Sequence, residues 1–222
     1  MPKNDFVNFA KNHRNVSSSL LDSYMRKSNS THHILDDTSD GIMIDIFSKL
    51  LSNRIIFLST EMDSDICNII KAQLLYLEQM DSEKDIKIYI DSPGGSVYSG
   101  LGLLDTMEYI KPDIVTINTG LAASMAAVLL CCGSKGKRKA LKRSRTMIHQ
   151  PMSGSYGMYQ ASDISIDANE INSLKYELYE IISNKTGQTQ KKVEQDADRD
   201  YWMTSEEAIK YGMIDEIILT KK

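Results

Sequence analysis

Strand-like and helix-like segments alternate from about residue 41 onwards, and this alternation constrains the fold more than any other feature of the chain. Residues 85–91 (DIKIYID) alternate isoleucine with polar residues, which is typical of a strand. Apolar residues at helical spacing precede this segment between Ile66 and Leu77, and a second strand pattern follows at 113–119 (DIVTINT). The order predicts parallel strands joined by right-handed crossovers, which is an α/β fold with its chemistry at the carboxyl ends of the strands.

The chain divides into two regions of different composition. Residues 1–40 are rich in Asn, Ser, Asp, Lys and His and hold no long apolar period, which predicts a flexible N-terminal extension. This extension is either a tail without a role or a functional arm, and part of it could be removed by cleavage. Residues 41–222 contain no internal repeat and no linker, so we expect a single domain there.

Composition argues against several classes of protein. The net charge of −4 offers no general attraction to nucleic acid or anionic lipid. No apolar run approaches the roughly 18 residues that span a bilayer, so we expect neither nucleic-acid nor membrane partners. Three cysteines without metal-ligand spacing, and no apolar secretory segment near the start, favour a cytoplasmic protein that binds no metal.

Local patterns in the later chain give more specific expectations. A small, apolar helix is expected over 122–132, and the basic run at 135–145 is expected to be a solvated loop. RNA binding by this run is disfavoured, because aromatic residues do not interleave with its cations. Gly187 is expected to end a long amphipathic helix, and Thr204 with Glu207 forms a capping box that begins a short one.

Ser124 is the first candidate for chemistry. It lies in the run GLAASMA, where we expect the first turn of a helix directly after a strand. A hydroxyl there is close to unpaired backbone N–H groups and to the positive end of the helix dipole, which suits a nucleophile beside developing negative charge. Serines are also common at helix starts for capping alone, and the run by itself favours that ordinary interpretation.

A base and an acid can be sought among the remaining polar residues. His149 ends the strand-like TMIH and is the only histidine outside the polar extension. A lone histidine is most often structural, but any imidazole base in this domain must be His149. Asp200 is one of three acids in DADRDYW, with Asp196 and Asp198, and the residues alone do not select among them.

The turn DSPGG, residues 91–95, is the other candidate for binding. Pro93 fixes φ, and the glycine pair lets backbone N–H groups approach a ligand closely. Such a turn could form an oxyanion hole or an anion-binding nest, and it could equally be an ordinary turn. Acyl-CoA enzymes also use glycine-rich oxyanion turns, so the pattern does not identify one reaction.

Taken together, the motifs resemble the proteolytic subunit of the Clp protease family. The resemblance covers roughly residues 42–220 and rests on five motifs in order: IDIFSKLLSNRIIFL, YIDSPGGSV, GLAASMAA, KGKRKALKRSRTMIHQP and DRDYWMTSEEAIKYGMIDEII. It implies a ClpP/crotonase-like spiral of ββα units with a protruding strand–helix handle at about 152–186.

The resemblance also implies roles for particular residues. Ser124 matches the nucleophile of the family, His149 the base, and Asp200 the acid that orients the base. Gly95 and Met125 match the residues whose backbone N–H groups form the oxyanion hole. A triad of this kind is recognised by the roles of its members and not by their order in the chain.

Further positions match contact surfaces of the family. Arg199 matches a residue that links contact between rings to alignment of the triad. Tyr89 and Tyr109 match positions of the cleft in which the unfoldase docks, whereas Lys87 and Lys139 stand where aromatic residues are common. The resemblance implies a homo-oligomer of two stacked heptameric rings, although the lysines leave room for a second type of subunit.

The implied function is that of a serine endopeptidase that cleaves unfolded polypeptides to short peptides inside an oligomeric chamber. A Clp-family ATPase unfoldase would feed the chamber, so ATP would be used by that partner, and this chain would need no cofactor. Two alternatives belong to other classes: a catalytically idle ring subunit of a mixed complex, and an acyl-CoA hydratase or isomerase on the related spiral. Because all three triad positions are filled and the set is Ser, His and Asp, both alternatives are disfavoured.

Overall fold

The computed structural model describes residues 17, 19, 33–35, 43–153 and 160–219, and every structural statement below concerns these residues. Most of the predicted extension at 1–40 lies outside the described residues. The same holds for 154–159, which include most of the strand expected in the handle. The boundary predicted near residue 41 therefore stays a prediction.

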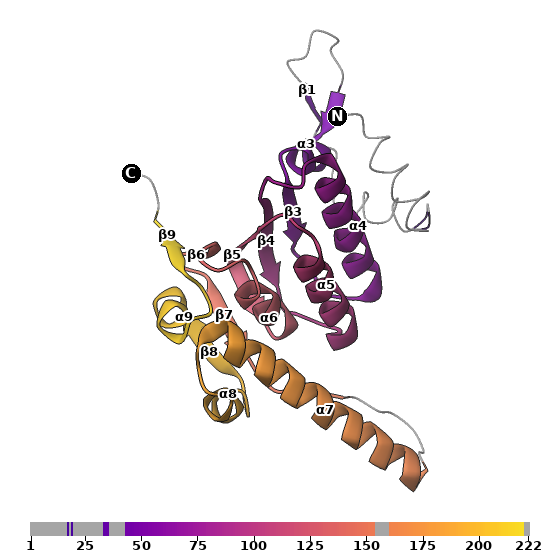
Figure 1. The fold of residues 1–222 in the computed structure, drawn as a ribbon, viewed down its shortest axis with the longest axis vertical. Coiled ribbons are helices and arrows are strands. Elements are labelled where there is room, and N and C mark those ends of the chain that lie inside the picture. Colours follow the sequence, from indigo (N-terminus) through magenta and orange to yellow (C-terminus); the bar gives the residue numbers. More distant parts are fainter. Residues whose placement is uncertain (1–16, 18, 20–32, 36–42, 154–159, 220–222) are drawn as a thin grey trace.

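A twisted sheet forms the centre of the fold, and its parallel strands confirm the α/β expectation (Figure 1). The parallel order is β3 (Ile55–Leu58), β4 (Ile86–Ser92), β5 (Ile114–Ala123), β6 (Arg138–Leu141) and β9 (Glu216–Ile218). The last part of β5 leaves β6 and pairs instead with β7 (Arg145–Ile148), again in parallel.

The strand at Tyr201–Thr204 was not expected from the sequence. Within the described residues this strand, β8 (Tyr201–Thr204), pairs only with β7 and runs antiparallel to it, so the sheet is mixed and not purely parallel. The YWMT segment is too short for a recognisable period, because four residues leave little to distinguish alternation from chance. This small antiparallel edge becomes important for the candidate site.

Helices connect and cover the strands. They are α3 (Ile46–Ser52), α4 (Ser64–Met80), α5 (Val97–Tyr109), α6 (Met125–Cys131), α7 (Ala161–Thr186), α8 (Gln190–Asp196) and α9 (Ser205–Tyr211), and a small antiparallel pair, β1 (His33–Leu35) with β2 (Met43–Asp45), precedes them. Capping fixes their ends: the Asp63 side chain accepts a hydrogen bond from the Ile66 N–H at the start of α4, and the Thr204–Glu207 capping box begins α9 as expected. None of the helices within the described residues is both long and apolar enough to cross a bilayer.

The core lies between the sheet and α4, α5 and α6. β4 buries every second side chain, whereas all seven residues of α6 are buried. The small residues of α6, such as Ala126 and Ala127, allow the sheet and the neighbouring helices to pack closely against this helix. A helix buried on all sides is held firmly, so the residue that joins it to β5 has a well-defined position.

α7 projects away from the body of the molecule, as the handle interpretation expects (Figure 1). Its buried side chains are Leu178, Tyr179 and Ile182, all in the C-terminal half, and Gly187 ends the helix in a left-handed conformation as predicted. Ile164 and Ile166 in the N-terminal half are 56% and 65% exposed. That half of the helix therefore carries apolar surface that is not covered by the described residues of this chain.

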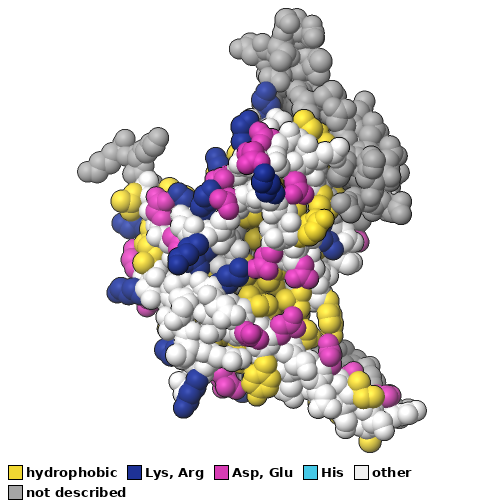
Figure 2. All heavy atoms as spheres, viewed as in Figure 1, with side chains coloured by type: hydrophobic (Ala, Val, Ile, Leu, Met, Phe, Trp, Pro, Cys, Tyr) yellow, Lys and Arg dark blue, Asp and Glu magenta, His cyan; other side chains and the backbone are white. Residues whose placement is uncertain are grey.

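The basic run at 135–145 is not a loop, which corrects the sequence interpretation. It contains strand β6, and three of its cations make ion pairs: Lys137 with Asp85 and Asp113, Arg138 with Asp215, and Lys139 with Glu216. Positive and negative side chains are accordingly mixed over the face shown in Figure 2. The cations in and next to strand β6 are thus paired with acids from distant parts of the chain.

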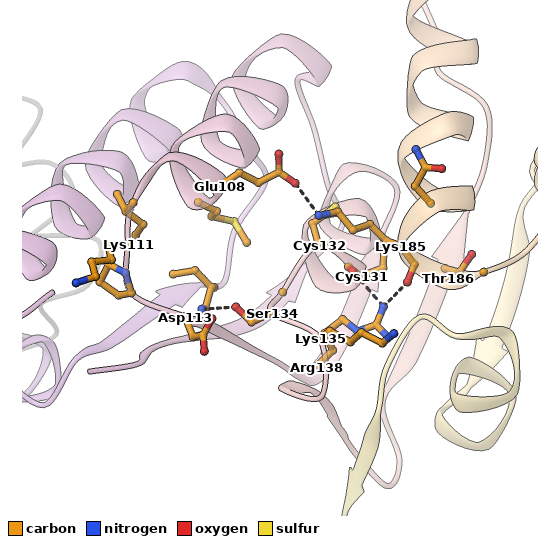
Figure 3. Close-up of a pocket in the computed structure, with 17 residues that line it drawn as sticks. Glu108, Lys111, Asp113, Cys131, Cys132, Ser134, Lys135, Arg138, Lys185 and Thr186 are labelled. Carbon is orange, nitrogen blue, oxygen red and sulfur yellow. Dashed lines mark hydrogen bonds and ion pairs between the residues drawn. The ribbon is translucent and has the colours of Figure 1, made fainter. Parts of the chain in front are cut away.

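A cavity of about 530 Å³ lies where the C-terminal ends of α5, α6 and α7 meet (Figure 3). The buried Arg138 guanidinium donates to the carbonyl oxygens of Cys131, at the end of α6, and Lys185, at the end of α7. Lys185 in turn donates to Glu108 at the end of α5. Since cations stabilise the carbonyl ends of helices, these charges serve the junction itself.

Candidate active site

Ser124 is the single residue between β5 and α6, and its backbone is strained. Its φ and ψ are 54° and −128°, in a region that residues other than glycine rarely adopt. Such a conformation costs about 1–3 kcal/mol and is typical of functional sites. The expectation that Ser124 lies inside the first helical turn is therefore wrong: β5 extends to Ala123, and the chain turns sharply at the serine, which resembles the strand-to-helix turn called a nucleophile elbow.

Pairing of the short strands brings the other two residues to Ser124. β7 runs beside the end of β5, so His149, directly after β7, lies next to the serine. Ile148 is paired with Tyr201 across the antiparallel β7–β8 ladder, which places Asp200 opposite His149. His149 Nε2 is 2.9 Å from Ser124 Oγ, and His149 Nδ1 is 3.0 Å from Asp200 Oδ1.

The hydrogen-bond roles in this row follow from the chemistry of the groups. An ionised carboxylate only accepts, so Nδ1 of a neutral His149 must carry the proton and donate it to Asp200. Nε2 is then the acceptor for the Ser124 hydroxyl. This is the tautomer in which an imidazole can take a proton from serine.

The structure also selects among the three acids that the sequence left open. The Asp196 carboxylate accepts hydrogen bonds from Lys192 and the Tyr211 hydroxyl, and Gln150 Nε2 donates to the backbone carbonyl of Asp198 and, at 3.4 Å, to its carboxylate. Only Asp200 reaches His149. Its side chain is 59% exposed, compared with 14% for His149, so water screens the carboxylate much more than the ring.

The glycine turn lies directly against the serine. A methyl group at Gly94 would be 2.8 Å from Ser124 Cβ and 2.9 Å from the Met125 backbone nitrogen. Gly95 forms a parallel β-bridge with Met62. The two hydrogen bonds of this bridge are made by its neighbours: the Met62 N–H donates to the Gly94 carbonyl, and the Ser96 N–H donates to the Met62 carbonyl.

Two N–H groups at this point have no acceptor. Because its neighbours make the bridge, the N–H of Gly95 faces away from Met62, and within the described chain it donates to no other group. The N–H of Met125, the first of α6, is likewise unpaired there, as expected at a helix start. Both N–H groups therefore remain available to a ligand beside Ser124.

A mainly apolar pocket opens beside the row. Its lining residues are Val97, Ser124, Met125, Val128, Ile148, His149, Pro151, Leu178, Tyr179 and Ile182. No carboxylate is among them. Tyr179 is not recognisable from the sequence as a lining residue, because it occupies one of the regularly spaced buried positions of α7. Only packing of these positions against α6 reveals it.

The remaining predicted site residues lie elsewhere. Arg199 is exposed and makes no salt bridge to any described residue. Tyr89 on β4 is half-buried, with its ring 5.5 Å from that of Phe57, and Tyr109 at the end of α5 is 81% exposed. Neither tyrosine lines the pocket at Ser124. Their suggested roles concern other subunits or partners, so a single chain does not test them.

A hydroxyl, an imidazole and a carboxylate joined in a row on an α/β sheet define a serine hydrolase of the triad type. Comparison with known proteins narrows this class, because residues 38–221 match the family described as Clp protease. The chain belongs to the Clp protease family.

Curated relatives agree along nearly the whole chain. An ATP-dependent Clp protease proteolytic subunit of Bacteroides fragilis is 51% identical over 98% of this chain and 99% of its own. Another, of Porphyromonas gingivalis, is 51% identical over 97% of both chains. A proteolytic subunit 2 of Synechococcus is 57% identical over 78% of this chain and 87% of its own.

Proposed function

We propose that this chain is a serine endopeptidase that uses Ser124, His149 and Asp200 to cleave unfolded polypeptides into short peptides. One observation carries the proposal: the unbroken row of hydrogen bonds from Ser124 Oγ through the imidazole to Asp200. The strained serine backbone and the open pocket beside it support the same function.

The reaction follows from the geometry. His149 Nε2 removes the hydroxyl proton as Ser124 Oγ attacks the peptide carbonyl, and the imidazolium then gives this proton to the leaving amine. Asp200 holds the ring in the required tautomer and stabilises its positive charge. Water, activated by the same imidazole, then attacks the acyl-enzyme and releases the second peptide.

The N–H groups of Gly95 and Met125 would stabilise the oxyanion. Neither has an acceptor among the residues that the structure describes, and the glycine turn and the start of α6 both adjoin Ser124, so these groups need no reorganisation when charge develops on the carbonyl oxygen. Removing one such donor typically costs 10²–10³ in rate. The pocket lined by Val97, Leu178 and Ile182 would hold the side chain that precedes the scissile bond.

We further propose that the chain works as a subunit of a cytoplasmic, ATP-dependent assembly. Its relatives are called proteolytic subunits of an ATP-dependent protease. Two stacked heptameric rings, with the exposed apolar half of α7 and Arg199 at the ring contact, would enclose the sites. A Clp-family ATPase, docking near Tyr89 and Tyr109, would supply unfolded chains and consume the ATP, and this chain itself would hold no cofactor.

Labelling with a fluorophosphonate tests the proposal. The reagent should modify Ser124 in the assembled protein, and Ser124→Ala should abolish both labelling and cleavage of a fluorogenic peptide while the oligomer persists in light scattering. Ser59→Ala, which removes an exposed hydroxyl elsewhere, should keep both. Cleavage by Ser124→Ala, or labelling at another residue, would refute the mechanism.

The same experiment separates the alternatives. A catalytically idle ring subunit would assemble but would neither label nor cleave. A hydratase or isomerase would act on acyl-CoA with no serine adduct. The pocket offers no carboxylate for such proton transfers, so we expect no turnover of acyl-CoA.

A further inference from the structure

Ser92, at the end of β4, is buried, and its hydroxyl joins two segments of the chain. It donates a hydrogen bond to the Thr60 carbonyl oxygen at 2.6 Å and accepts one from the Gly94 N–H at 3.1 Å. Ser92 is 0% exposed, and the Gly94 N–H has no other acceptor among the described residues. Removing the hydroxyl would therefore leave this N–H unpaired at a buried position, which is costly.

Residues 60–62, here called the strap, lie beside the glycine turn and are bound to it by three hydrogen bonds. The Met62 N–H donates to the Gly94 carbonyl oxygen and the Ser96 N–H donates to the Met62 carbonyl oxygen, both at 2.7 Å. The Ser92 hydroxyl makes the third bond, at the first residue of the strap. The strap is therefore attached to the turn at both of its ends.

The strap fixes the direction of the Gly95 N–H. This N–H and the Gly94 carbonyl belong to one planar trans peptide unit, so they point in opposite directions. Because the Met62 N–H holds the carbonyl, the Gly95 N–H points away from the strap. The turn also lies against the nucleophile, since a methyl group at Gly94 would be 2.8 Å from Ser124 Cβ. A movement of the strap would thus rotate this donor relative to Ser124.

The turn has little stiffness of its own. Gly94 and Gly95 have φ values of +91° and +148°, which glycine adopts readily and other residues rarely. Neither has a side chain that could pack against its surroundings, and Pro93 restricts only its own φ. The conformation of the glycine pair therefore depends on hydrogen bonds, and the Ser92 hydroxyl supplies one of them from a side chain.

We propose that Ser92 is a positioning residue for the oxyanion hole: its hydroxyl ties the strap to the turn and so holds the Gly95 N–H where the oxyanion forms. The inference rests on the proposed peptidase function, since it assigns a role to a residue that supports the same site. Ser92 does not line the pocket beside Ser124 and acts only through the backbone. Its loss should therefore weaken binding of the transition state and not of the substrate.

Ser92→Ala in the full assembled protein tests this with two measurements. Cleavage of a fluorogenic peptide gives kcat and KM, and inhibition by a peptide boronate of the same sequence gives Ki. The boron accepts the Ser124 oxygen as its fourth ligand, and one boron-bound oxygen then occupies the place of the oxyanion. The Ki of this transition-state analogue therefore reports on the oxyanion hole.

The two measurements should change together. We expect kcat/KM to fall about tenfold through kcat and Ki to rise about tenfold, with KM changed less than about twofold. These changes are smaller than the roughly 10²–10³-fold loss on complete removal of an oxyanion donor, because the Gly95 N–H is displaced and not deleted.

Ser205→Ala is the matched control. The Ser205 hydroxyl is also buried, at 1% exposed, and donates to the Leu141 carbonyl oxygen at 2.8 Å, in a different part of the fold. Both variants should lower the Tm, because each loses a buried hydrogen bond. Ser205→Ala should keep kcat/KM and Ki within about twofold of the parent values. Ser92→Cys retains a weak donor, so its values should lie between those of the parent and Ser92→Ala.

Each outcome decides the question. A parallel change in kcat/KM and Ki in Ser92→Ala, absent from Ser205→Ala, supports the inference. Unchanged kinetics, a loss confined to KM, or the same loss in Ser205→Ala overturns it, because the hydroxyl then serves folding alone. If Ser92→Ala does not assemble, Ser92→Cys is compared in its place, and failure of both to assemble also overturns the inference. A parent protein that neither cleaves the peptide nor binds the boronate would instead refute the proposed function.

Discussion

Replacing Gly94 with alanine tests how closely the glycine turn must approach the nucleophile. An added methyl group would lie 2.6 Å from the Ala123 carbonyl oxygen, 2.8 Å from Ser124 Cβ and 2.9 Å from the Met125 nitrogen. Contacts under 3.0 Å are not tolerated, and two of these atoms belong to the backbone. The turn or the serine junction must therefore move.

The size of the effect has two parts. Gly94 has φ +91°, and alanine in such a conformation costs roughly 1–2 kcal/mol. Relief of the clash would shift the turn by several tenths of an ångström relative to Ser124, and displacements near 1 Å cost about 10²-fold in rate. We expect Gly94→Ala to lose about 2–3 kcal/mol of unfolding free energy and about 10²-fold in kcat/KM.

Gly136→Ala provides a matched control. Gly136 has a similar φ of +82°, but an added methyl group would meet no atom within 4 Å. This variant should lose only the conformational part, about 1–2 kcal/mol in urea unfolding, with peptide cleavage unchanged. The difference between the two variants isolates the close approach to Ser124. If Gly94→Ala cleaves peptide as fast as Gly136→Ala, the turn does not shape the site and the reasoning is wrong.

Two more predictions concern carboxylates. Asp200→Asn should lower kcat about 10²–10³-fold in peptide cleavage. The loss should be smaller than for a buried triad acid, because this carboxylate is 59% exposed. A complete loss of cleavage, or no loss, would contradict this. Hydrogen bonds from Arg138 lower the pKa of the Asp215 carboxyl in the folded protein. The ion pair therefore stabilises the fold at pH values above the pKa that Asp215 has in the unfolded chain, and this stabilisation is lost as the pH falls through its lower pKa in the folded protein. Asp215→Asn should thus cost about 2 kcal/mol in urea unfolding at pH 7, with the difference from the parent narrowing below about pH 4. A gap that is constant down to pH 2 would contradict this.

Periodicity and capping were sufficient to predict much of the scaffold. The alternating isoleucines of β4 and the apolar positions of α4 are local signals, as are the Thr204–Glu207 capping box of α9 and Gly187 at the end of α7, and the structure confirms them. The strand character of β6 was hidden, because its cations depend on ion pairs with acids far along the chain, such as Asp215. Charges that are neutralised by tertiary contacts cannot be recognised within a short window.

At the candidate site, too, some features could be predicted from the sequence and others depend on tertiary contacts. The motif order indicated Ser124 and His149, and the structure brings them within hydrogen-bonding distance. The residues alone left three acids open and the family resemblance indicated Asp200, whereas the physical reason for that choice, the register of β7 with β8, is encoded in no local pattern. The strained backbone of Ser124 arises where a strand meets a buried helix, and this junction is not visible in the sequence alone.

The short strand β8 has a consequence for how the site can fail. Asp200 is positioned by the four-residue edge strand β8, whereas Ser124 and His149 adjoin strands of the central sheet. Fraying at this edge would carry the carboxylate away while the hydroxyl and the imidazole stayed together. Displacement of Asp200 would then precede unfolding of the core. Increased hydrogen exchange at the amides of β8 should therefore accompany loss of catalytic activity under conditions in which the rest of the domain is still folded.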